Sequence, residues 1–132
     1  MKRSMMLAAA ITTIAGQAHT LSCMRPDPIE TFQTLAEAEE SYFVLHGVLS
    51  FDEQALPQGV GENDRAIPDP IPARFVGKGL TKEGFTNTYV SDVNLQIGCA
   101  GAWCGSASSG TQGVDFVRAS EPPVTMTADA CG

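Results

Sequence analysis

Apolar and polar residues alternate along much of this chain, which is the pattern of strands that bury one face. In the clearest case, Val93, Leu95 and Ile97 alternate with polar residues. Similar segments, separated by turn-forming residues, predict five strands, over residues 42–51, 73–80, 88–97, 114–119 and 124–131. Gly47 interrupts the apolar face of the first strand and indicates a bend, such as small barrels use to turn corners.

One short helix is predicted ahead of the strands, over residues 28–39. Asp27, Pro28 and Glu30 stand where a capping residue, a first helical residue and a capping-box glutamate are expected. Apolar residues at positions 32, 35 and 36 follow at helical spacing, and the glutamates beyond them suit a solvated face.

Two stretches lack both patterns. Residues 52–72 hold four of the chain's eight prolines and predict a long loop. Loops of this length in compact domains are commonly either functional or disordered. Residues 106–113 are mostly small and predict a connector that packs against nothing.

Two of the four cysteines and the single tryptophan follow the third predicted strand. Four residues separate Cys99 from Cys104, and nearby glycines supply the freedom for a chain reversal, so we predict a small loop closed by a disulfide. The tripeptide Trp103-Cys104-Gly105 also occurs at thioredoxin-type sites. A redox pair, however, needs two residues between its cysteines at the start of a helix. The prediction is therefore a structural disulfide.

The first 18 residues have the layout of a secretory signal peptide, because basic residues precede an apolar stretch. Cleavage after Ala18 leaves one mature domain, residues 19–132; a cut after Thr20 is the weaker alternative. The apolar stretch is shorter than the ~20 residues of a membrane-spanning helix. We therefore expect a bacterial periplasmic or secreted protein that does not span the membrane, in a compartment where disulfides form.

The charge of the chain limits its partners. The formal net charge is −7, and it becomes −9 when Lys2 and Arg3 leave with the signal peptide. An acidic surface repels phosphate backbones and anionic lipids, so nucleic acid is not an expected partner.

No arrangement of residues predicts a catalytic, cofactor or metal site. His46 lies within a strand among apolar residues and suits a structural role, whereas a zinc site needs three or four ligands. The acidic run at residues 62–64 lacks the alternating ligand spacing of a calcium loop. The serines at 106, 108 and 109 lie in a flexible connector with no activating partner.

A mainly β fold with five strands and one N-terminal helix predicts a five-stranded OB-like Greek-key barrel braced by disulfides. The cysteine pattern resembles the netrin-module domain of tissue inhibitors of metalloproteinases. That domain begins Cys-x-Cys, runs into prolines, continues through Cys-Gly and a hydrophobic strand, and ends its last strand in cysteine. The matching segments here are Leu21-Ser22-Cys23-Met24-Arg25-Pro26, Cys104-Gly105, Asp115-Phe116-Val117 and Thr125-Met126-Thr127 before Cys131.

The resemblance implies a second disulfide, between Cys23 and Cys131, and a protein-binding or inhibitor-like module. In that family the leading cysteine chelates the zinc ion of a protease, but Leu21 stands at its position here. We therefore expect binding to another protein, a protease being the class implied, without zinc chelation. The expected contact surface is a ridge formed by Leu21, Ser22, Met24, Ala102 and Trp103.

An enzyme or small-ligand carrier is the open alternative. Its site would lie at the barrel mouth near the loop of residues 52–72. Residues such as Asp52, Glu62 and Asp64 would form it.

Overall fold

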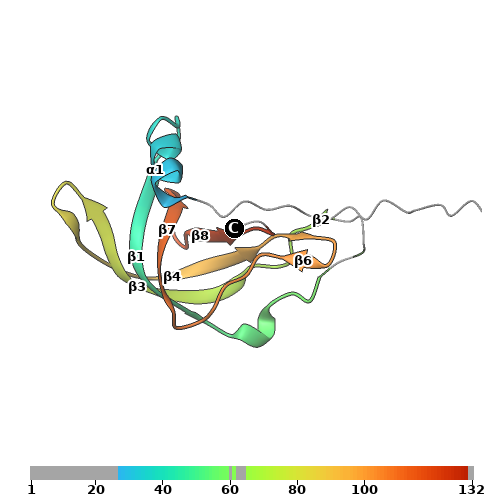
Figure 1. Cartoon of the computed structure of the whole chain (residues 1–132). Coiled ribbons are helices and arrows are strands. Elements are labelled where there is room, and N and C mark those ends of the chain that lie inside the picture. The colour runs from blue at the N-terminus through green and yellow to red at the C-terminus, as the bar shows by residue number, and fades with distance from the viewer. Residues whose placement is uncertain (1–26, 60, 62–64, 131–132) are drawn as a thin grey trace, which may run out of the picture.

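The computed structural model describes residues 27–59, 61 and 65–130, and its main feature is a curled five-stranded sheet (Figure 1). The strands follow one another in space as β7-β1-β3-β4-β8. They are antiparallel neighbours except for β4 and β8, which are parallel. Their bounds are β1 (Tyr42–Phe51), β3 (Ile71–Thr81), β4 (Gly84–Ile97), β7 (Gln112–Arg118) and β8 (Thr125–Ala128).

This order confirms the predicted OB-like Greek-key barrel. Three strands joined in sequence, β1, β3 and β4, lie side by side, and β7 returns to pair with the first of them. At the other edge, β8 comes into contact with β7 without forming a ladder with it. The barrel is therefore nearly closed, with one seam that backbone hydrogen bonds do not join.

Short elements occupy part of the predicted loop of residues 52–72. The chain forms a 3₁₀ turn, η1 (Glu53–Ala55), and a two-residue strand, β2 (Arg65–Ala66). This strand begins a second sheet, whose other members are β5 (Cys99–Ala100) and β6 (Trp103–Cys104). In Figure 1 the small sheet lies at the end of the barrel opposite the hairpin that joins β3 and β4.

The β3–β4 hairpin is longer than the sequence predicts. Pairing continues to Thr81 and Gly84, where a φ of 102° at Gly84 lets the chain turn tightly. The sequence predicts that β4 starts at residue 88, because the polar residues at 86–88 show no alternation. The structure explains this, since residues 86–88 are all exposed.

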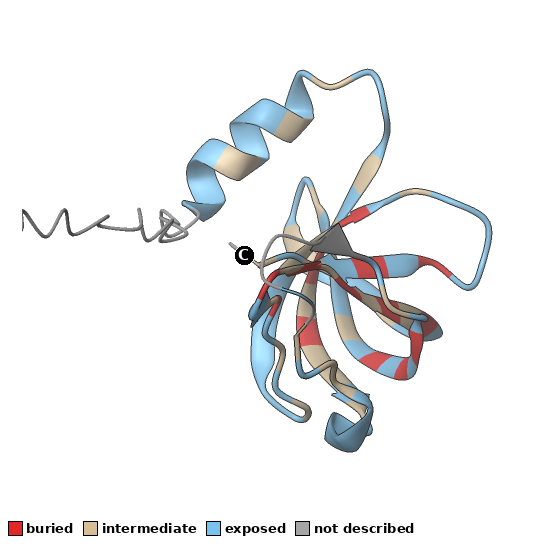
Figure 2. Ribbon diagram, turned by 90° about the vertical axis from the view of Figure 1, so that its right-hand side faces the viewer, coloured by how far each residue is buried: buried red, intermediate tan, exposed pale blue. Residues whose placement is uncertain are grey.

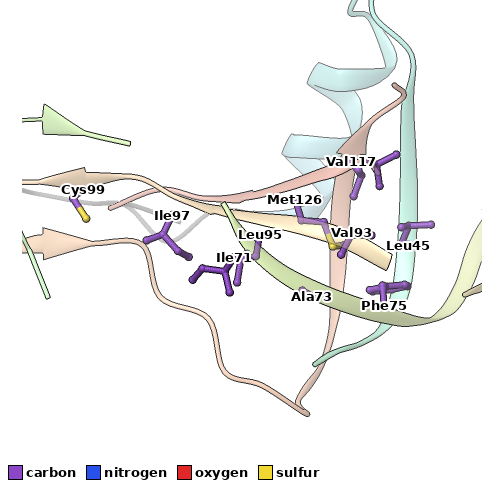
Figure 3. Packing of buried hydrophobic residues seen from close by; sticks show 11 residues of the cluster. Leu45, Ile71, Ala73, Phe75, Val93, Leu95, Ile97, Cys99, Val117 and Met126 are labelled. Carbon is purple, nitrogen blue, oxygen red and sulfur yellow. The ribbon is translucent and has the colours of Figure 1, made fainter. Parts of the chain in front are cut away.

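The core fills the barrel from end to end (Figure 3). Phe75 is fully buried near one end, where Leu45 and Val117 lie, and Ile97 and Cys99 mark the other end. The cluster contains residues from every strand of the main sheet: Leu45, Ile71, Ala73, Phe75, Val93, Leu95, Ile97, Cys99, Val117, Val124 and Met126. Apolar alternation thus becomes a single interior, as period-2 strands require.

The helix α1 (Pro28–Ala36) is confirmed, although it ends three residues before the predicted end. The Asp27 carboxylate caps it by accepting a hydrogen bond of 2.8 Å from the backbone nitrogen of Ile29. None of its residues is buried, and Figure 2 shows it standing at the side of the barrel. The helix therefore contributes little to the core.

β1 and β3 approach each other closely at a pair of glycines. Gly47 lies opposite Gly77, and a Cβ atom added to Gly47 would lie only 2.6 Å from the Gly77 Cα and 2.7 Å from the Phe75 ring. Only glycine therefore fits at this position, and Phe75 occupies the space that side chains would have filled.

We expect Gly47→Ala to destabilise the domain by at least about 2 kcal/mol, because the new methyl group overpacks the core beneath Phe75. Gly113→Ala is the matched control. Gly113 lies opposite Gly47 on β7, and an added Cβ there meets nothing within 4 Å. Urea unfolding measures both variants. Equal stabilities would contradict this account of the barrel's bend.

Candidate functional site

The structure describes two of the five predicted ridge residues. Ala102 and Trp103 are exposed, whereas Leu21, Ser22 and Met24 lie outside the described residues. Cys23 and Cys131 also lie outside them, so the pairing of these two cysteines stays a prediction.

The predicted Cys99–Cys104 disulfide is confirmed. It joins residues that lie directly opposite each other in the β5–β6 hairpin, and Ala100 lies opposite Trp103. Gly101 makes the reversal with a φ of 59°. We refer to residues 99–104 as the cysteine finger. Its Trp103 side chain is 50% exposed.

The base of the finger is held against β8. The backbone nitrogen of Gly98 donates to the Ala128 carbonyl at 2.9 Å, and that of Gly105 donates to the Gly98 carbonyl at 2.8 Å. A Cβ atom on Gly105 would overlap the Ala128 carbonyl. The backbones approach so closely that they fix the direction in which the finger leaves the barrel.

The prediction that residues 106–113 pack against nothing is wrong. Ala107 packs against the core. The Ser109 hydroxyl accepts a hydrogen bond of 2.9 Å from the backbone nitrogen of Phe51, and the Ser109 nitrogen donates to the Glu53 carboxylate at 2.7 Å. These bonds hold the connector against the end of β1. They use backbone and hydroxyl groups, so no hydrophobic pattern in the sequence predicts them.

Of the acidic residues suggested for a site in the loop of residues 52–72, only Asp52 is described. Its carboxylate caps η1 by accepting a 3.0 Å hydrogen bond from the Gln54 nitrogen. Glu62 and Asp64 lie outside the described residues. The structure thus gives Asp52 a local role and does not bring this acidic set together.

His46 lies on the outer face of β1. Its ring contacts that of Phe85, with the ring centroids 5.3 Å apart. Within the described part of the chain, no three His, Cys, Asp or Glu side chains gather as a metal site would require.

A hollow of about 280 Å³ opens at the unjoined seam between β7 and β8. The inner faces of the barrel strands and the connector form its walls. The described residues that line it are Gly47, Leu49, Leu95, Ser106, Ala107, Ser108, Thr111, Gly113, Asp115, Met126, Thr127 and Ala128.

Asp115 is the only titratable residue in that lining. It lies opposite Leu45 and two positions before buried Val117, so it belongs to the inward row of β7. Burial raises the pKa of its carboxyl group, since the charged form loses hydration.

No described residue donates a hydrogen bond to the Asp115 side chain. All fully buried side-chain oxygens of the described residues have a partner, so the carboxyl group of Asp115 must still reach water. The hollow gives it that access. The sequence gives little signal for this residue, because Val114 and Phe116 make the opposite face of the strand look like the buried one.

No family model, curated protein or solved structure matches the chain. The resemblance to tissue inhibitors of metalloproteinases therefore stays a prediction. Among the described residues, no helix combines the length and apolar composition needed to cross a membrane.

The raised pKa of Asp115 predicts how stability depends on pH. The folded protein holds the Asp115 proton more tightly than the unfolded chain does. The stability that this proton contributes is therefore fully present below the ordinary pKa of 3.8, and it is lost as pH rises through the pKa of the folded protein. Asp115→Asn should therefore be more stable than the wild type at neutral pH, and the difference should shrink below pH 3.8.

Urea unfolding at a series of pH values measures this difference. Asp69→Asn removes an exposed carboxylate and is the matched control for the change in net charge. A wild type that gains stability over Asp115→Asn as pH rises would contradict the assignment.

Proposed function

We propose that this domain is an exported protein-binding module that contacts its partner through the cysteine finger. The observation that carries the proposal is the half-exposed Trp103 on a hairpin closed by a disulfide. Tryptophan is among the residues most enriched in the energetic centres of protein interfaces. A domain that leaves this large apolar surface in water gains nothing in stability from it.

The rigidity of the finger supports this proposal. The disulfide joins its two strands, β2 pairs with its outer edge, and hydrogen bonds hold its base to β8. The loop of residues 52–72 also passes close to the tip of the finger: a Cβ atom on Gly59 would lie 3.3 Å from the Ala102 Cα. A preorganised contact surface loses little conformational entropy when it binds, so more of its contact energy appears as affinity.

For the residues before Asp27, the sequence alone indicates a part in binding. Leu21, Ser22 and Met24 belong to the proposed ridge, and Leu21 replaces the zinc-chelating cysteine of the resembling family. Binding should therefore depend on burial of side chains and not on a free terminal amine. A protease remains the class of partner that the resemblance suggests.

The test is to identify the partner from the exported proteins of the source bacterium and to measure its affinity by calorimetry. Trp103→Ala should weaken binding about thirtyfold or more, because truncation of a central interface residue costs roughly 2 kcal/mol or more. Acetylation of the mature N-terminus should leave the affinity unchanged.

Phe43→Ala is the matched control for this measurement. Phe43 is 45% exposed and lies beside Leu80 and Asn87 near the β3–β4 hairpin, away from the finger. If Phe43→Ala or acetylation abolishes binding and Trp103→Ala does not, the finger is not the contact surface.

Replacing Cys99 and Cys104 together by serine should leave a folded domain that is about 2 kcal/mol less stable, the chain-entropy value for opening so short a loop. The same variant should also bind the partner more weakly, because the finger loses its preorganisation. Circular dichroism, urea unfolding and calorimetry measure these effects. Unchanged affinity in the folded double variant would contradict a role for the disulfide in binding.

A further inference from the structure

We propose that the hollow at the β7–β8 seam binds one organic cation, an ammonium or guanidinium group, with Asp115 as its counter-charge. This site is separate from the cysteine finger. The position of Asp115 in the barrel, the size of the hollow and the residues that line it support this proposal.

The position of Asp115 favours a missing partner. Its carboxyl group lies on the inward row of β7, opposite Leu45, without a hydrogen bond from any described residue. Partial burial of an acid costs free energy unless the charge is compensated. A ligand that donates hydrogen bonds and carries a positive charge would supply both kinds of compensation.

The size and lining of the hollow favour a single cationic group on a short aliphatic stem. A volume of about 280 Å³ lies just below the ~300 Å³ at which small-molecule pockets usually begin. Leu49, Leu95 and Met126 offer apolar contact for the stem, while Ser106 and Thr127 offer hydroxyl oxygens as further acceptors.

A metal ion fits this lining poorly. Calcium takes six to eight oxygen ligands, commonly with several carboxylates, and zinc takes histidine or cysteine nitrogen and sulfur. The described lining offers one carboxylate and a few hydroxyl groups. An organic cation needs only one counter-charge and two or three acceptors.

Binding should depend on pH in one direction. The ligand pairs with the ionised form of Asp115, so affinity should fall as acid protonates the carboxyl group. No other titratable side chain from β1, β4, β8 or the connector lines the hollow among the described residues. A single protonation event should therefore govern the loss of binding at low pH.

The test is an NMR titration of the isotopically labelled protein with n-butylammonium, and with n-butanol as the neutral probe of similar shape. We expect n-butylammonium to shift the side-chain carboxyl carbon of Asp115 and the amides of Ala107, Gly113 and Thr127. We expect n-butanol to leave them unchanged. Equal shifts with both probes, or shifts that fall elsewhere, would overturn the proposal.

Asp115→Asn keeps the shape of the side chain and removes the charge. It should weaken n-butylammonium binding about tenfold or more, because a hydrogen bond to a charged group is worth roughly 1.5–3 kcal/mol. Asp69→Asn, which loses an exposed carboxylate, should bind as the wild type does. Equal weakening in both variants would mean non-specific attraction to an acidic protein.

A second titration separates two sources of the cation. Lysine blocked at both ends, as the N-acetyl, N′-methylamide derivative, mimics a side chain of a bound protein. If blocked lysine binds at least as tightly as n-butylammonium, the site accepts a basic residue of a partner. If n-butylammonium binds and blocked lysine does not, the site accepts a small ligand. Trp103→Ala should leave both titrations unchanged, so failure at the finger and failure here can be told apart.

Discussion

The contact of the Phe75 ring with the Gly47–Gly77 pair is the constraint on which the rest of the barrel depends. Two facing glycines let β1 and β3 approach and bend, and the Phe75 ring fills the space that their missing side chains leave. This close approach favours the curl of the sheet that brings β7 into contact with β8. The sharp coiling of a small barrel therefore relies on a few backbone positions as much as on the total apolar area buried.

The bend brings the edges of the sheet together but does not join them. β7 pairs only with β1, and β8 pairs only with β4, so the facing edges form no ladder. The connector of residues 106–113 covers one end of this seam through a backbone hydrogen bond from Gly110 to Leu49 and hydrogen bonds around Ser109. What remains is a hollow in which Asp115 keeps access to water. An acid on the inward side of a strand is tolerated there because the barrel is incomplete at that place.

The sequence predicted the parts of this fold that depend on side-chain alternation. The five strands and the Cys99–Cys104 loop leave local patterns, and the structure confirms them. Gly47, where the pattern predicts a bend, is where β1 and β3 approach too closely for a side chain. It did not predict the packing of the connector or the hollow, because both depend on which backbone segments meet after the barrel closes. The sequence does not indicate the role of Asp115 for the same reason. The alternation of Val114 and Phe116 suggests an outward Asp115, and its inward position becomes visible only when the neighbouring strands are in place.

The cysteine finger and the hollow share one structural element, β8. The Ala128 carbonyl accepts a hydrogen bond from Gly98 at the base of the finger, and Ala128 also lines the hollow. Trp103 is therefore carried on a hairpin whose direction depends on the same strand that forms one wall around Asp115. The two surfaces face different environments, since one exposes an apolar ring to water and the other holds a partly buried acid beside apolar side chains. Partial burial of the acid costs the isolated domain free energy, and exposure of the Trp103 ring gains it none, so a ligand or partner that pairs with the acid or covers the ring would be stabilising.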